Sequence, residues 1–267
     1  MTNAPLTAIH SSTHTNSSIA IKNLCISHKA NRIIDCLSLA IPTNKITCII
    51  GPSGSGKSTL LRSFNRMDAN LESWRVAGDL LVNGKNILSK NCDLIQLRKQ
   101  VGMLFQQACV FPTSIYENVL FGLRAHQRIT KDEGDSLVKE LLISVGLWSE
   151  VSDRLEQRAE TLSIGQQQRL CLARTLALQP SILLLDEPTS SLDPQSTRSI
   201  ENLCLEQNGK ITQVFVTHNL GQAKRIADYM VFLCEGKLIE AGPARNFFSH
   251  PTKQETKAYL SDESRAC

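Results

Sequence analysis

The sequence predicts an α/β fold in which a sheet of short buried strands is interrupted by a mainly helical segment. Three observations support this class. Residues 46–50 form a short apolar run that leads into a glycine-rich loop, residues 51–58. Residues 182–185 form a second apolar run, which ends in an acidic pair. Runs of this length are typical of strands buried on both faces. From about 88 to 165 the pattern turns mainly helical.

The glycine-rich loop fits G-x-x-x-x-G-K-[ST], the phosphate-binding P-loop. Its glycines let backbone N–H groups point at a triphosphate, and the helix that follows adds positive potential at its N-terminus. We expect Lys57 to reach the β- and γ-phosphates and the Ser58 hydroxyl to bind Mg²⁺. The residues of this loop expected to bind nucleotide are Gly51, Pro52, Ser53, Gly54, Ser55, Gly56, Lys57, Ser58 and Thr59.

The remaining elements follow from apolar spacing and turn residues. We expect strands at 19–26, 33–40, 45–50 and 213–216, hairpins at 80–87 and 229–241, and an amphipathic helix at 132–145. The hairpins turn at Asn83-Gly84 and Glu235-Gly236. Residues 1–18 and 261–267 are expected to be tails around a single domain at 19–260.

Composition excludes several classes of protein. With 42% hydrophobic residues, the 267-residue chain can bury an ordinary core. A net charge of +4 is too small to argue for a nucleic-acid partner. No apolar run approaches the roughly 20 residues that span a bilayer. No Cys-x-x-Cys occurs, and neither the cysteines nor the histidines show the spacing of metal ligands.

An acidic pair, Asp186 and Glu187, follows the second apolar run. The carboxyl end of a buried parallel strand lies at the sheet edge where ligands bind. Asp186 would hold Mg²⁺, and Glu187 would polarise the attacking water as a general base. Taken alone, such a pair also fits a simple surface cap of a strand.

A further motif, Leu162-Ser163-Ile164-Gly165-Gln166, precedes a helical run. Ser163 and Gln166 form an S-x-x-Q capping box, so in isolation the motif predicts only a well-capped helix. A helix N-terminus that contains glycine is also a phosphate site. Two separate phosphate sites in one chain suggest that one of them serves a partner's nucleotide.

Together these motifs resemble the ATP-binding subunits of ABC transporters, over about residues 19–260. In order, they are the P-loop (51–58), the Q-loop (101–106), the signature (162–166), the acidic pair (186–187), the D-loop (191–193) and the switch histidine, His218. The resemblance implies a P-loop core with an antiparallel β subdomain and a helical subdomain inserted at about 88–165.

The resemblance also implies roles for individual residues. Two cassettes face head to tail, and each ATP lies between one P-loop and the partner's Ser163, Gly165 and Gln166. Gln106 touches Mg²⁺ or the water, and His218 contacts the γ-phosphate. Asp193 acts across the dimer. The implied catalytic residues are Glu187, His218 and Gln106, and the implied Mg²⁺ ligands are Ser58, Gln106 and Asp186.

Segments 64–67, 111–118 and 169–174 look like the ATP-binding subunit of the bacterial phosphate importer. That likeness implies phosphate as cargo, two polytopic permease subunits, an indirect phosphate-binding partner, and a place on the cytoplasmic face of the inner membrane. Two positions depart from the family. Ile164 replaces the usual Gly of the signature, and His28 stands where the family stacks adenine on an aromatic ring. We expect an altered rate and weaker adenine binding.

Other functions fit parts of the pattern. The same ATPase could serve another oxyanion or an amino acid, because nothing in this chain touches the cargo. A non-transport ABC ATPase for DNA repair or translation usually carries a second cassette or a long coiled coil, and neither is seen. Residues 162–166 argue against a P-loop kinase, and a GTPase would need N-K-x-D. Glu187 and His218 argue against a regulatory module that binds ATP without turnover.

Overall fold

The computed structural model describes residues 17–67 and 73–261. Residues 1–16 and 262–267 of the expected tails lie outside this part. Ser17 and Ser18 belong to the first strand, and the Ser18 hydroxyl lies 2.8 Å from that of Thr212. No described helix is long and apolar enough to cross a bilayer.

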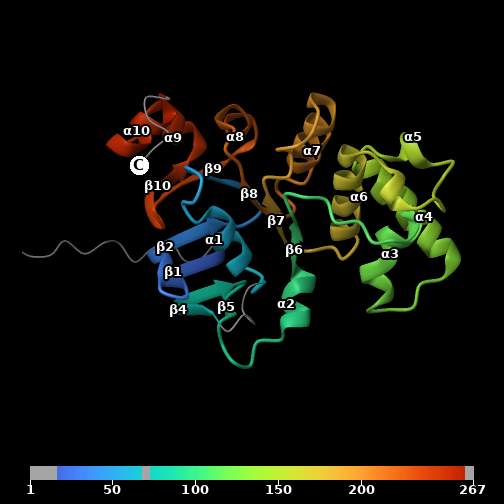
Figure 1. Cartoon of the computed structure of the whole chain (residues 1–267), viewed down its shortest axis with the longest axis horizontal. Helices are drawn as coiled ribbons and strands as arrows, with labels where there is room; N and C mark the ends of the chain where they lie inside the picture. Colours follow the sequence, from blue (N-terminus) through green and yellow to red (C-terminus); the bar gives the residue numbers. More distant parts are fainter. Residues whose placement is uncertain (1–16, 68–72, 262–267) are drawn as a thin grey trace, which may run out of the picture.

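A small antiparallel sheet lies at one side of the molecule, with strand order β2-β1-β4-β5 (Figure 1). Its strands are β1 (Ser17–His28), β2 (Asn31–Pro42), β4 (Trp74–Val82) and β5 (Lys85–Asn86). The hairpin between β4 and β5 turns at Asn83 and Gly84, which both have positive φ (47° and 77°). That conformation is typical of a type I′ turn, as the Asn-Gly pair predicts.

The larger sheet has the order β10-β9-β3-β8-β7-β6, and all its neighbours are parallel except β9 and β10. Its strands are β3 (Ile46–Ile50), β6 (Val101–Leu104), β7 (Ile182–Asp186), β8 (Thr212–Val216), β9 (Tyr229–Cys234) and β10 (Lys237–Pro243). Every residue of β3, β7 and β8 is buried, which explains their mainly apolar character. The predicted α/β class is therefore confirmed.

Helices surround the larger sheet and form a separate group at one end of the molecule (Figure 1). The end group comprises α3 (Ile115–Arg124), α4 (Lys131–Ser144), α5 (Trp148–Val151), a 3₁₀ turn (Ala159–Thr161) and α6 (Ile164–Leu176). The others are α1 (Lys57–Ser63), α2 (Leu94–Gln100), α7 (Pro194–Glu206), α8 (Leu220–Ile226), α9 (Ala244–Ser249) and α10 (Gln254–Leu260).

The stretch 88–165 contains α2, α3, α4, α5 and the 3₁₀ turn, and it also contains β6, the edge strand of the larger sheet. The four residues of β6 pair in parallel with β7. A strand this short, interrupted by Gly102, gives no periodic signal and is specified by its pairing partner. The helical group therefore follows β6 along the chain.

Helix α1 holds the two sheets together. Its Leu60 and Leu61, with Phe64 just beyond it, are fully buried in one core cluster with residues of both sheets. Burying such side chains stabilises the fold by about 1.5–3 kcal/mol each. A second cluster joins the opposite face of the larger sheet to the helical group. The loop before α1 is thus fixed by the packing of the helix that it opens.

Candidate ATP-binding site

Functional side chains gather at one edge of the larger sheet because four neighbouring parallel strands end there. The P-loop follows β3, His218 follows β8, Asp186 ends β7, and Gln106 follows β6. A cavity of about 380 Å³ at this edge is lined by Lys57, Ser58, Gln106 and Glu187, together with Ile33, Ser53, Gly54, Gly56 and Thr59. Residues far apart in the sequence therefore share one pocket.

The P-loop wraps around the Lys57 ammonium. Lys57 Nζ donates to the carbonyl oxygens of Gly51 (2.8 Å) and Pro52 (2.7 Å). Burial lowers the pKa of Lys57, while the nearby carboxylates of Glu187 and Asp186 act in the opposite direction. Gly51 is required because a Cβ there would lie 2.0 Å from the carbonyl oxygen of Leu233. The loop thus presents a cation in a cradle that only glycine can form.

Ser58 and Asp186 form a pair of oxygen ligands suited to a hard cation. Ser58 Oγ donates to Asp186 Oδ1 at 2.7 Å, and Asp186 is only 2% exposed. Arg62 Nη2 lies 3.3 Å from Asp186 Oδ2. A hydroxyl and a carboxylate at hydrogen-bond distance are the donors that Mg²⁺ prefers, so these residues fit the ion.

Glu187 has an unusual backbone for a non-glycine residue, with φ of 44°. Its N–H donates to the carbonyl of Val216 at 3.0 Å, which ties it to the neighbouring strand β8. Its Oε2 lies 3.1 Å from His218 Nδ1. Residues held in left-handed conformations cluster at functional sites because the surrounding structure must stabilise them. The pairing places a carboxylate and an imidazole beside the cradle.

Gln106 lines the same cavity. Its Nε2 lies 3.4 Å from Ser190 Oγ, in the loop that follows Glu187. The Gln106 side chain is exposed. It is therefore free to exchange this long bond for a ligand in the cavity.

A buried polar network supports the loop that carries His218. Thr217 Oγ1 donates to Gln222 Oε1 (2.9 Å), and Gln222 Nε2 donates to Glu201 Oε1 (3.0 Å). Arg225 Nη2 also donates to Glu201 Oε1, at 2.7 Å. Burial alone would raise the pKa of Glu201, but the bonds from Arg225 and Gln222 outweigh it and hold the pKa below its ordinary value. Sequence reasoning missed this network, which shows no motif.

The signature segment opens α6 as predicted. Ser163 caps the helix, and Gln166 completes the capping box by accepting from the Ser163 N–H at 2.9 Å. Gln166 also donates to Glu150 of α5, and Arg169 forms an ion pair with the same carboxylate at 2.7 Å. Ile164 is 63% exposed, so its apolar side chain is presented to solvent at the helix N-terminus.

The signature lies against the D-loop rather than against the P-loop cavity of its own chain. A Cβ on Gly165 would lie 2.6 Å from Ser196 Oγ, so α6 and α7 pack too closely for a side chain there. Asp193 caps α7 by accepting from the N–H groups of Gln195 and Ser196. The structure therefore divides the predicted site residues into two groups. Most residues of the P-loop, with Gln106 and Glu187, line the cavity, and Asp186 and His218 contact it through Ser58 and Glu187. Ser163, Gly165, Gln166 and Asp193 do not line it.

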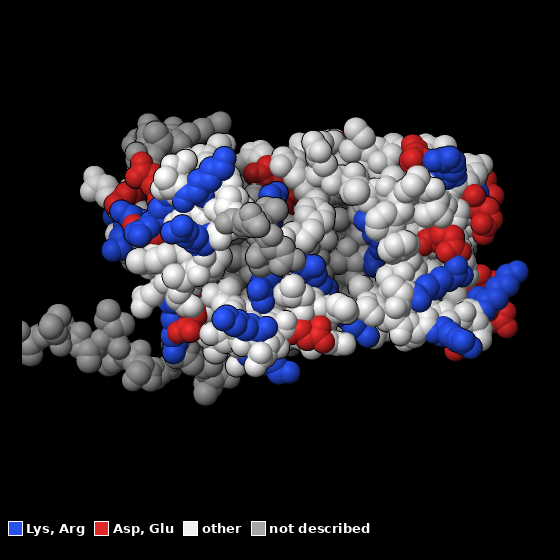
Figure 2. All heavy atoms as spheres, turned by 60° about the horizontal axis from the view of Figure 1, so that its bottom comes forward, with Lys and Arg blue, Asp and Glu red and all other residues white. Residues whose placement is uncertain are grey.

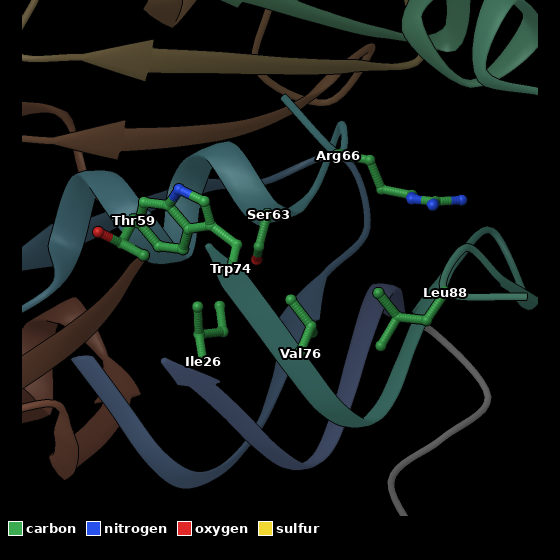
Figure 3. A pocket seen from close by; sticks show the side chains of 7 residues that line it. All are labelled: Ile26, Thr59, Ser63, Arg66, Trp74, Val76 and Leu88. Atoms are coloured by element: carbon green, nitrogen blue, oxygen red, sulfur yellow. The ribbon is translucent and has the colours of Figure 1, made fainter. Parts of the chain in front are cut away.

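His28 packs against a residue that sequence reasoning missed. Its ring centroid lies 4.9 Å from that of Trp74, its pairing partner on β4. Trp74 lines a pocket with Thr59 and Ser63 of α1, and Figure 3 shows its indole lying across that helix beside Thr59. Thr59 also lines the P-loop cavity. The aromatic ring of Trp74 therefore lies next to the P-loop cavity, with Thr59 between them. In the sequence, only the single residue Trp74 could have indicated this.

The fold and the site together define a nucleotide-binding cassette, and comparison with known proteins identifies the family. The family model described as ABC transporter matches residues 34–190. The chain belongs to the ABC transporter family and carries its ATP-binding domain. It therefore acts as a transport-coupled ATPase subunit.

Two solved structures are similar to the chain. CbiO1 from Clostridium perfringens, part of the ABC transporter complex CbiONQ, is 26% identical, with a TM-score of 0.75. That match covers 93% of this chain and 97% of CbiO1. A bacterial Atm1-family ABC exporter with ATP bound is 21% identical, with a TM-score of 0.78. The match covers 98% of this chain but only 44% of the exporter, and it supports the fold alone.

Proposed function

We propose that the chain is the energy-coupling ATPase of an importer for inorganic phosphate and works as a head-to-tail dimer. The separation of the site residues into two groups is the observation that supports a dimer. The cavity around Lys57 and Glu187 is open, and the capped N-terminus of α6 at Ser163 is exposed elsewhere. Each group alone contacts only part of an ATP molecule, and two copies placed head to tail complete both sites.

In the proposed site, each residue acts through its chemistry. The Lys57 ammonium and the P-loop N–H groups bind the triphosphate, and Glu187 accepts a proton from the attacking water. His218 positions the Glu187 carboxylate through the 3.1 Å contact. Ser58 and Asp186, with Gln106 as a further oxygen donor, would hold Mg²⁺, which neutralises charge on the phosphates. The N–H groups at the start of α6 bind the partner's γ-phosphate.

The cargo rests on likeness to the phosphate importer subunit. The segments that show this likeness form hydrogen bonds that stabilise the fold of the chain. Asn118 is fully buried and bonds the carbonyls of Phe111 and Ser114, and Arg174 donates to the Cys109 carbonyl. They shape the surface beside Gln106 rather than a cargo site. Another oxyanion or an amino acid is therefore the second candidate.

The surface around Phe111 and Phe121 supports docking to membrane subunits. The rings are 4.3 Å apart, Phe121 is 54% exposed, and the Arg174 guanidinium lies 4.2 Å from the Phe111 ring centroid. Exposed aromatic and Arg side chains are enriched at protein interfaces. We propose that two polytopic permeases dock here, beside the Q-loop, and that a phosphate-binding protein delivers the cargo. On the face in Figure 2, charges of both signs are interspersed, which gives no support to a nucleic-acid partner.

Phosphate uptake in a deletion strain tests the cargo. We expect loss of high-affinity uptake of radiolabelled phosphate, with restoration by the wild-type gene but not by the Glu187→Gln variant. Membrane fractions should retain the chain only when the permeases are present. Normal phosphate uptake, with a defect for another solute, would overturn the cargo and leave the ATPase intact.

Calorimetry tests the nucleotide site directly. Lys57→Ala removes a charged donor, so we expect ATP affinity to fall roughly 10- to 100-fold. Lys85→Ala, in the exposed β4–β5 hairpin, is the matched control and should bind ATP normally. Equal binding by both variants would show that the triphosphate does not occupy this cradle.

A further inference from the structure

A pair of free thiols outside the ATP site lies across the first two strands. Leu24 pairs with Leu37 and Ile26 pairs with Ile34, so Asp35 and Cys36 together face the single residue Cys25. This two-against-one arrangement is a β-bulge, a feature that redirects side chains. Cys36 has a φ of 48°, in the left-handed region. The bulge brings three side chains with metal-binding atoms onto one small patch.

The distances within this patch fit a shared cation. The Cys25 and Cys36 sulfurs are 3.1 Å apart, and one oxygen of Asp35 joins them so that all three atoms lie within 4.8 Å of one another. Two thiolates bound to one tetrahedral Zn²⁺ are separated by roughly 3.8 Å. A disulfide would require about 2.05 Å. The observed separation is thus closer to that of a shared metal than to that of a bond between the sulfurs.

Arg32 is a charged neighbour of the patch. Arg32 pairs with Asp35 through Oδ1 at 2.7 Å, so Oδ2 stays outside that ion pair. A metal that binds here replaces the two thiol protons, and its affinity therefore rises with pH. Cys36 is exposed, which gives a cation access from solvent.

We propose that Cys25, Asp35 and Cys36 form a binding site for a thiophilic divalent cation of the Zn²⁺ class, with water completing the tetrahedron. Thiolate ligands select such ions over Mg²⁺ and Ca²⁺. The site is therefore chemically distinct from the oxygen ligands of Ser58 and Asp186. The spacing of the cysteines along the chain does not reveal it, because β1 and β2 come together only in the folded sheet.

Cobalt substitution of the reduced full chain tests the site. We expect one Co²⁺ per chain, with thiolate-to-cobalt absorption and tetrahedral d–d bands that Zn²⁺ displaces and excess Mg²⁺ does not. Loss of an outer-shell group typically costs 10- to 100-fold in metal affinity. Cys25→Ser and Cys36→Ser remove direct ligands, so each should lower Zn²⁺ affinity by more than about 100-fold. At a Co²⁺ concentration that just saturates the wild type, each variant should therefore show no thiolate band. Asp35→Asn should weaken binding and retain that band.

Cys92→Ser and Cys109→Ser are the matched controls, since both are free thiols outside the cluster. Both should bind Co²⁺ like the wild type, and circular dichroism should show that every variant is folded. The wild-type spectrum is decisive by itself. Absence of thiolate absorption in the reduced chain, or a band that survives in both Cys25→Ser and Cys36→Ser, would overturn the proposal. The proposal would also be overturned if Cys25 and Cys36 form a disulfide in air and the reduced chain binds no Co²⁺.

Discussion

The imidazole of His218 meets the carboxylate of Glu187 at 3.1 Å, although 31 positions separate the two residues in the sequence. The contact joins the ends of two adjacent parallel strands, β7 and β8. Glu187 is 20% exposed and His218 is 65% exposed, so the pair lies at the boundary between the cavity and solvent. This location suits a base that must reach water and a partner that must reach a phosphate.

Glu187→Gln should abolish most ATP hydrolysis. The amide retains the shape of the side chain but not its basicity, and loss of a general base costs about 10²–10⁴-fold in rate. The variant should also accumulate an ATP-bound dimer, seen by size-exclusion chromatography with light scattering. Glu140→Gln, exposed on α4, is the matched control. A monomeric Glu187→Gln variant with full activity would rule out this role.

The neighbouring rings of His28 and Trp74 should contribute to adenine binding. Base–aromatic stacking is worth roughly 1–3 kcal/mol by alanine substitution in nucleic-acid complexes, which sets the scale here. His28→Tyr should tighten ATP binding, and Trp74→Ala should weaken it roughly tenfold or more, both measured by calorimetry. The affinity of each variant for inorganic triphosphate, which lacks a base, separates the contribution of adenine from that of the phosphates. If triphosphate affinity falls in parallel with ATP affinity, Trp74 supports the cradle rather than the base.

Gly51→Ala should destabilise the chain. The new Cβ would lie 2.0 Å from a backbone oxygen, and overpacking of this kind costs about 1–3 kcal/mol or more. Gly242→Ala is the control, because nothing lies within 4 Å of its added Cβ. Urea unfolding should show a lower midpoint for Gly51→Ala alone. Equal midpoints would mean that the P-loop can move away from β9 at little cost.

Glu201→Gln should alter stability in a pH-dependent way. The folded-state pKa of Glu201 lies below the ordinary 4.5. Such a carboxylate contributes stability above its unfolded pKa and loses it as the pH falls through the folded value. We therefore expect a loss of about 1–3 kcal/mol at pH 7 that shrinks toward pH 4, measured by urea unfolding. Glu206→Gln, exposed at the end of α7, should show no such trend.

Sequence reasoning predicted those parts of the fold that depend on local chemistry. The P-loop glycines, the Asn83-Gly84 turn and the Ser163 cap each need particular residues at fixed spacing, and each is confirmed in the structure. Strand β6 and the His28–Trp74 contact depend instead on pairing between distant segments. The network from Thr217 to Glu201 is also non-local, and ordinary polar residues give it no motif. The roles of the site residues in catalysis stay predictions.

Asp193 caps helix α7 beside the signature of its own chain, and the helix carries Glu201 about two turns later. Glu201 binds Gln222, and Gln222 binds Thr217, the residue before His218. This chain of hydrogen bonds connects α7 to the loop that carries His218. In the proposed dimer, a nucleotide bound to one subunit contacts the start of α7 in the other subunit. Through this chain of hydrogen bonds it would influence the position of His218 in that other subunit. The two sites would then hydrolyse ATP in a coordinated order rather than independently.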